Sequence, residues 1–207
     1  MSYRHRLALH FAVLGLLPST PVGAAPKPLE GIALEWRATT TPAALGFQPL
    51  TADRFGSSMV EIPTLADKRE GDPRAIGEYR PEGKPVLPLT TSTDVAAFVT
   101  GHLRESLAGV GVPVSAEGAA GTVRLRGELL EFFVVEEKEY VARVRLAFVL
   151  ESAKGIELWR GSVGATSGST GRAYRKEIFF ETLSDAVVQC AVELLQEPGF
   201  QFAIAGR

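Results

Sequence analysis

Hydrophobic and polar residues alternate along neighbouring stretches in the second half of the chain. Within Val123–Leu129 and again within Tyr140–Leu150, apolar residues alternate with charged or polar ones. A period of two is typical of a strand that buries one face. A turn at Glu136–Glu139 connects these two strands, and a tight turn at Lys154-Gly155 leads to a third, Ile156–Val163. The pattern therefore predicts an antiparallel meander of three strands.

A helical pattern precedes this meander, and another follows it. From Asp94 onward, apolar residues recur at spacings of three and four, and the Asp94 carboxylate suits the first turn of a helix. Thr93 or Ser92 can cap this helix. Its apolar stripe consists of Val95, Phe98, Val99, Leu103, Leu107 and Val110. The second helix is predicted from about Phe179 until Pro198 ends it.

Three segments lack such patterns. Residues 25–58 contain several prolines, so we expect a loosely structured lead-in with one short strand at Ile32–Arg37. Arg69–Leu89 is interrupted throughout by glycine and proline, which predicts a long irregular loop, and loops of this length are often functional. Gly164–Gly171 is predicted to be a small-residue loop between the meander and the second helix.

The order of the predicted elements defines a fold class. Met59–Ala66 alternates moderately and predicts an opening strand, with Pro63 at a bulge or an edge. The elements then follow as strand, helix, three strands and helix. We therefore predict an α+β fold with an antiparallel sheet of about four strands and two helices packed on one face. We expect this domain to span residues 59–200, followed by a C-terminal tail at 201–207.

The start of the chain has the composition of a secretory signal peptide, residues 1–24. Met1–Arg6 carries two arginines, and Leu7–Leu17 is apolar apart from one histidine. Small or β-branched residues lead to the expected cleavage between Ala24 and Ala25, with a cut after Ala25 as the alternative. The 11 residues of the apolar run are fewer than the ~20 needed to span a bilayer. We therefore expect a periplasmic protein with no transmembrane segment in its mature chain.

Composition narrows the set of partners. Without residues 1–24, 183 residues remain, with 20 Lys and Arg against 24 Asp and Glu and thus a net charge of −4. Such a chain has no field that attracts nucleic acid or an anionic membrane surface. Cys190 is the only cysteine, so the chain forms no internal disulfide. It also offers no cysteine at the site where a bacterial lipoprotein is acylated, so we expect no lipid anchor.

The order and spacing of several short motifs resemble the YajG-like family of bacterial envelope lipoproteins. The resemblance covers Met59–Phe200 and includes Asp67-Lys68-Arg69, which matches a D-x-R signature, and Ile76-Gly77. The other matching motifs are Asp94–Val99, Leu103–Gly111, Leu183–Ala186 and Leu194–Pro198. The resemblance implies an envelope protein without established enzymatic activity, with a fold similar to auxiliary lipoproteins of envelope transport and lipid export. Unlike the family, this chain lacks the lipidated cysteine.

Arginines on the predicted sheet form the first candidate binding surface. Alternation places four of them on the face opposite the apolar positions: Arg124, Arg126, Arg143 and Arg145. Such a row could meet acidic lipid headgroups or the carboxylates of a partner. The alternative is an exposed sheet face on which Glu128 and Glu151 pair with the arginines.

Asp67 and Arg69 form a second candidate, because residues two apart in a strand point the same way. They could contact a ligand or partner at the mouth of the Arg69–Leu89 loop. Alternatively, Asp67 accepts hydrogen bonds from loop N–H groups while Arg69 clamps the loop. We favour the structural interpretation.

Residues for reaction chemistry are scarce. His102 is the only histidine after residue 24, and Cys190 lies on the apolar side of the last helix. One histidine and one cysteine are too few soft ligands for zinc. The acidic turn Glu136–Glu139 lacks the spacing of a calcium loop, and Gly164–Arg172 lacks the lysine of a phosphate-binding loop. We therefore expect no catalytic residue, metal or cofactor.

The sequence thus predicts a non-enzymatic periplasmic protein that acts by binding an envelope protein or lipid component. Its expected role is that of an accessory in envelope assembly or in lipid or ABC-type transport. One alternative is an oligomeric envelope scaffold that pairs through an exposed sheet edge. A second alternative is a periplasmic hydrolase, which needs a pocket that brings His102 near a serine and an aspartate.

Overall fold

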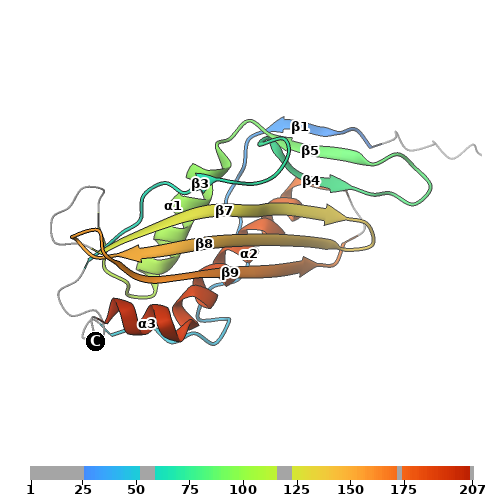
Figure 1. Ribbon diagram of the computed structural model, residues 1–207. Coiled ribbons are helices and arrows are strands. Elements are labelled where there is room, and N and C mark those ends of the chain that lie inside the picture. Colours follow the sequence, from blue (N-terminus) through green and yellow to red (C-terminus); the bar gives the residue numbers. More distant parts are fainter. Residues whose placement is uncertain (1–25, 52–58, 116–122, 172–173, 206–207) are drawn as a thin grey trace, which may run out of the picture.

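The computed structural model describes residues 26–51, 59–115, 123–171 and 174–205, so the expected signal peptide and its cleavage site at Ala24 and Ala25 lie outside the described residues. The described residues form one sheet of nine strands, with helices on one of its faces (Figure 1). The predicted antiparallel sheet of about four strands with two helices is therefore wrong. The sheet mixes parallel and antiparallel pairs, and the described residues form three helices.

The predicted meander forms the long half of the sheet. It consists of β7 (Val123–Glu136), β8 (Tyr140–Glu151) and β9 (Glu157–Ser169), with β8 antiparallel to both neighbours. However, β9 continues through most of the segment predicted to be a small-residue loop, Gly164–Gly171. The pairing with β8 explains the difference, since Ala165 lies opposite Val144 and every residue to Ser169 has a partner on β8.

Short strands, most of them in parallel pairs, form the other half of the sheet along the free edge of β7. Those that pair with β7 are β2 (Val60–Glu61), β3 (Ala66–Asp67) and β4 (Ala75–Tyr79). Three further strands extend this half: β5 (Leu87–Thr91) beside β4, β1 (Leu29–Ile32) beside β5, and β6 (Val114–Ser115) beside β2. All of these parallel pairs were absent from the predicted fold.

The pairing of these short strands is not visible in the sequence pattern, because it joins segments that lie far apart in the chain. The predicted loop Arg69–Leu89 contains β4 and the first part of β5. The predicted strand Met59–Ala66 is divided around Pro63 into β2 and the start of β3. Gly77 shows how closely β4 approaches β7, since a Cβ atom at this position would lie 2.4 Å from the Val134 carbonyl oxygen. The glycine that reads as a loop signal in the sequence permits strand contact here.

The helices begin and end largely where the sequence indicates. Helix α1 (Val95–Gly109) is capped by Asp94, whose Oδ1 accepts the Ala97 N–H at 3.0 Å. The prediction that Thr93 or Ser92 is the cap is therefore wrong, because the helix begins one residue later than expected. Helix α2 (Lys176–Gln196) ends before Pro198. The chain then forms α3 (Pro198–Ile204), which extends into the residues expected as a tail.

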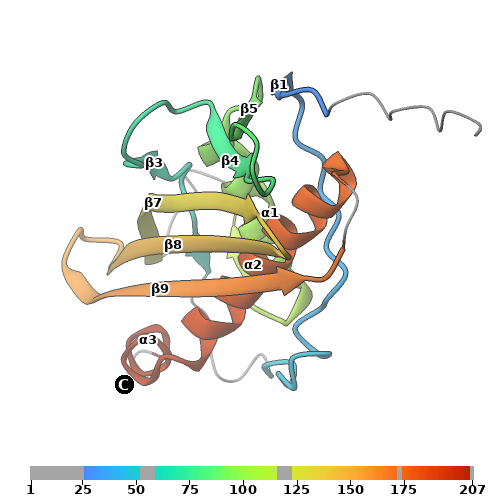
Figure 2. The same cartoon turned by 90° about the vertical axis from the view of Figure 1, so that its right-hand side faces the viewer.

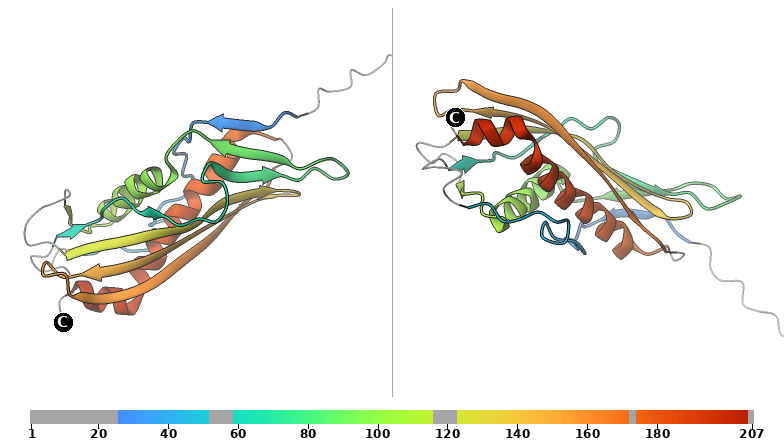
Figure 3. Two further views of the ribbon diagram at one scale, coloured as in Figure 1. Left: turned by 45° about the horizontal axis from the view of Figure 1, so that its top comes forward. Right: turned by 90° about the horizontal axis from the view of Figure 1, so that it is seen from below.

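The core lies between the sheet and the two longer helices. Inward side chains of β7 and β8 pack against α2, and Figures 2 and 3 show α1 and α2 gathered on this one side of the sheet. No helix among the residues described is long and apolar enough to cross a membrane. The opposite side of β7, β8 and β9 has no helix over it in these views, and we call it the open face.

Candidate functional site

The open face carries the four arginines predicted to form a binding surface. Arg124 and Arg126 lie on β7, Arg143 and Arg145 on β8, and all four are exposed. They do not form one row. The register places Arg124 and Arg126 near the β8–β9 turn, opposite Glu151 and Val149, whereas Arg143 and Arg145 lie opposite Phe133 and Glu131.

The two β7 arginines are engaged in ion pairs. Arg124 donates from Nε and Nη2 to the two carboxylate oxygens of Glu61 on β2, each at 3.2 Å. Glu61 is only 3% exposed, so this pair compensates a nearly buried carboxylate. Arg126 donates to the Glu151 carboxylate. At this end of the open face the geometry supports the alternative in which acidic residues pair with the arginines. Glu151 is one of the two partners expected, whereas Glu61 takes the place expected for Glu128.

The two β8 arginines are free. Within the described residues, neither Arg143 nor Arg145 makes an ion pair or a hydrogen bond through its side chain. Their neighbours on β9 are small, because Thr166 lies opposite Arg143 and Gly164 lies opposite Arg145. Both arginines are therefore exposed, and no large side chain of β9 lies directly opposite them. Arginine in this state is suited to bidentate recognition of a carboxylate or phosphate.

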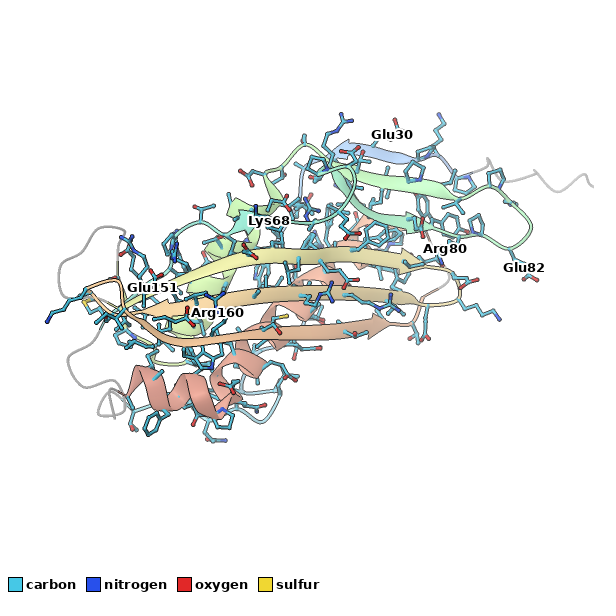
Figure 4. All side chains as sticks on the ribbon, viewed as in Figure 1. Glu30, Lys68, Arg80, Glu82, Glu151 and Arg160 are labelled. Atoms are coloured by element: carbon cyan, nitrogen blue, oxygen red, sulfur yellow. The ribbon has the colours of Figure 1, made fainter. Side chains whose placement is uncertain are left out.

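A hollow of about 460 Å³ lies beside Arg145. Lys68 and Glu70, which follow β3, form part of its wall, and Leu130 and Phe133 of β7 contribute apolar surface. Figure 4 shows Lys68 beside β7. Arg145 thus borders a depression that combines apolar and charged groups, as protein contact surfaces do.

A second hollow of about 650 Å³ lies toward the β8–β9 turn. Arg126 and Arg160 line it, and Arg160 Nη2 lies 2.7 Å from Glu157 Oε2. The hydrogen bond from Arg160 lowers the pKa of the Glu157 carboxyl. Because both arginines are already paired, this hollow offers no free cation of its own.

Asp67 and Arg69 form a bidentate pair at the end of β3. Arg69 Nε and Nη2 lie 2.9 and 2.8 Å from the two oxygens of Asp67, and Arg69 Nη1 donates to the Ala75 carbonyl at 3.0 Å. The hydrogen bonds from Arg69 hold the pKa of Asp67 below its usual value. The Arg69 side chain is only 6% exposed. This geometry supports the interpretation that the pair holds the 70–74 segment in place.

His102 lies in an aromatic cluster on α1. Its ring stacks on Trp36 with centroids 4.0 Å apart, and Phe98 meets it edge-on at 4.7 Å. Its Nδ1 lies 2.8 Å from Glu105 Oε2. The contacts of His102 within the described residues therefore include neither the serine nor the aspartate that the hydrolase alternative requires.

The Cys190 thiol and the acidic side chains in the described residues also lack the surroundings of a reactive site. Burial raises the pKa of the Cys190 thiol to about 12, and its Sγ lies 3.5 Å from the Val144 carbonyl oxygen. A thiol with so high a pKa is a poor nucleophile. No group of three or more His, Cys, Asp or Glu side chains that could hold a metal occurs in the described ranges.

Glu61 and Glu136 are buried carboxylates that the sequence analysis missed. Glu136 falls in the segment predicted to be an acidic turn, yet it is only 5% exposed, and its Oε2 has no hydrogen-bond partner within the described residues. Burial raises the pKa of this carboxyl. The sequence pattern could have indicated this burial, because every second residue at this end of β7 points inward and Glu136 follows Phe132 and Val134 in that alternation.

Comparison with solved structures finds similar folds at low sequence identity. XCC0632 from Xanthomonas campestris, described with the family name DUF330, has a TM-score of 0.55 and 12% identity over 84% of this chain and 95% of that chain. The hypothetical protein CT253 from Chlamydia trachomatis has a TM-score of 0.48 and 8% identity over 73% and 100%. Lipoprotein GNA1162 from Neisseria meningitidis has a TM-score of 0.34 and 13% identity over 65% of this chain and 98% of that chain.

The likeness to the Xanthomonas protein shows a shared fold and does not extend to activity or partner. The other two structures are too distant to support an argument. The chain matches no protein-family model and no curated protein. Membership of the YajG-like family therefore stays a prediction.

Proposed function

We propose that the protein is a periplasmic envelope protein of the YajG-like type, which acts by binding and not by catalysis. Its role is that of an accessory in envelope assembly or in lipid or ABC-type transport. Its contact surface is the part of the open face that carries Arg143 and Arg145. The partner is a protein that presents carboxylates to these two arginines.

The free state of Arg143 and Arg145 carries this proposal. Both are exposed and, unlike Arg124 and Arg126, neither has an acidic partner within the described residues. A guanidinium that is already paired must break one interaction to make another, whereas these two need not. Bidentate Arg–carboxylate pairs are among the stronger and more geometrically specific hydrogen-bonded contacts in proteins.

A protein partner fits this surface better than an anionic membrane does. A membrane responds to the summed charge of the approaching surface, and the chain without its first 24 residues carries −4. Glu70 and Glu131 also line the hollow beside Arg145, so the positive charge there is local. A protein partner instead contacts individual charged groups in fixed positions, so it can bind two arginines that have acidic neighbours.

The settings of His102 and Cys190 support a binding role. His102 is held between two aromatic rings and a glutamate, and Cys190 is buried with a raised pKa. Neither lies in one of the hollows described on the open face. A hydrolase with a Ser–His or Cys–His nucleophile would need His102 beside a substrate site.

The test compares capture of envelope proteins by the immobilised wild-type protein and by the R143E/R145E variant. The matched control is K138E/K154E, which makes the same change in net charge at two exposed lysines in the β7–β8 and β8–β9 turns. A partner of the proposed surface is captured by the wild type and the control and is lost with R143E/R145E. Equal capture of every protein by all three would contradict the proposal.

A further inference from the structure

Strand β9 leaves one long edge of the sheet without a partner. It pairs with β8 only, and within the described residues its backbone makes no hydrogen bond to another backbone group on the other side. Helix α3 lies at one end of this edge (Figure 2). Phe200 of α3 packs edge-on against Trp159 of β9 there, with ring centroids 5.2 Å apart. The stretch Gly161–Ser169 lies beyond that contact.

This stretch has none of the usual protection of an edge strand. Natural edge strands carry charged residues or proline, or are interrupted by bulges. Gly161–Ser169 contains no charged residue and no proline, and its pairing with β8 runs without a register shift. An exposed edge of this kind is a template for strand addition.

We propose that a second copy of this chain occupies the edge, with the two β9 strands antiparallel and Ala165 opposite its own counterpart. The stretch is compatible with its own reversed sequence in this register. Gly164 lies opposite Thr166 of the second copy, Ser162 opposite its Gly168, and Val163 opposite its Ser167. Each pair joins small or medium side chains, and no like charges meet, so the interface is isologous as a two-fold dimer requires.

The same register keeps the two faces of the sheet in phase. Opposed residues differ by an even number of positions, so outward residues meet outward residues and the helices of both copies lie on one side. The open faces then form one surface, on which Arg143 and Arg145 of each copy are separated by the two β9 strands. At ~4.8 Å per strand spacing, the two arginine pairs stand about 14 Å apart.

The experiment combines light scattering with cysteine cross-linking of the purified protein. The wild type is expected to have twice the mass of one chain. G164C and T166C variants are then mixed and mildly oxidised. Gly164 accepts a side chain, because the nearest atom to an added Cβ is the Val144 carbonyl oxygen at 3.6 Å. The native Cys190 is buried and takes no part.

The proposed register predicts that the mixture of G164C and T166C forms a disulfide that neither variant forms alone. In the mixture, one cysteine lies directly opposite another, within reach of a disulfide. Each variant alone places its two cysteines on a diagonal, about 7–8 Å apart and out of reach. Cross-linked dimer in the mixture and little with either variant alone supports the proposal. A single-chain mass for the wild type, or a mixture that cross-links no more than its components, overturns it; circular dichroism confirms that each variant is folded.

A second variant tests the interface without cysteine chemistry. G164K/T166K places lysines directly opposite lysines of the second copy, and such like-charge pairs oppose strand pairing. The measured mass is expected to fall by half while the circular dichroism spectrum is retained. A folded G164K/T166K variant that keeps twice the mass of one chain would show that the dimer, if present, forms elsewhere. Neither readout depends on the partner of Arg143 and Arg145.

Discussion

The Trp36 ring stacks on His102 with an interplanar angle of 12°. Trp36 lies in the segment expected to be a loose lead-in, and it is fixed to α1 through this contact. The same segment is fixed to α2 as well, because Asp185 Oδ1 accepts the backbone N–H groups of Thr39 at 2.6 Å and Thr40 at 2.9 Å. The described part of the lead-in is thus a strap across both helices.

Removal of the Asp185 carboxylate should loosen this strap. D185A loses the acceptor for two backbone N–H groups and for the Thr39 hydroxyl, so we expect a loss of about 2 kcal/mol in the free energy of unfolding. Urea denaturation followed by tryptophan fluorescence measures this, since Trp36 lies in the strap. E193A is the control, because Glu193 is exposed on the same helix. Equal stability of D185A and wild type would show that the strap does not depend on Asp185.

Loss of the Asp67 side chain should lower the free energy of unfolding of the whole domain. D67A leaves the nearly buried Arg69 guanidinium without its carboxylate, which we expect to cost about 2 kcal/mol. Because Arg69 lowers the pKa of Asp67 in the folded state, this contribution is present above the ordinary pKa of aspartate. It is lost as the pH falls through the lowered value.

Thermal unfolding of D67A and of the control D72A tests this expectation. Asp72 pairs with Arg74 in a half-exposed setting, so its removal should matter little. An unchanged melting temperature of D67A, together with loss of a captured partner, would favour the contact role for Asp67 and Arg69 instead.

Glu136 should make stability depend on pH in the opposite sense. Burial raises the pKa of its carboxyl above the ordinary 4.5, so the folded state holds this proton more tightly than the unfolded state does. The stability from the protonated form is present below 4.5 and is lost as the pH rises through the folded value. E136Q keeps the shape without the charge, so it should be more stable than the wild type at neutral pH and similar to it in acid.

Urea unfolding midpoints of E136Q and wild type across this pH range provide the measurement. E137Q serves as the control, because Glu137 is exposed in the adjacent turn. A difference between E136Q and wild type that does not change with pH would mean that the Glu136 carboxylate is not penalised by burial.

The thiol of Cys190 should be unreactive in the native protein. Burial raises its pKa to about 12, so the reactive thiolate is scarce at neutral pH and access is closed. Alkylation followed by mass spectrometry is expected to label Cys190 in denaturant and not in buffer. Rapid labelling of the folded protein would contradict the placement of Cys190 in the core.

The parts of the fold that follow local patterns could be predicted from the sequence. Period-two alternation gives β8, and Asp94 with its apolar stripe gives α1. The pattern of Met59–Ala66 indicates a strand where β2 and β3 lie, but β4 and the parallel pairing of all three with β7 could not be predicted, because each has only two to five residues and forms on the edge of β7.

The candidate site, too, could be predicted from the sequence only in part. Alternation along the strands places all four arginines on the exposed side, as the sequence analysis expected. Which of them are free depends on contacts between distant segments, since Arg124 meets Glu61 only because β2 lies beside β7. Periodicity cannot reveal that Arg143 and Arg145 are the pair left available.

Equilibrium binding of the captured partner to wild type and to R143E/R145E tests the central claim most directly. Two charge-assisted contacts at ~1.5–3 kcal/mol each predict that the dissociation constant rises by at least about a hundredfold in the variant. K138E/K154E is expected to bind as the wild type does. A dissociation constant that is the same for R143E/R145E and wild type would show that the open face is not the binding surface.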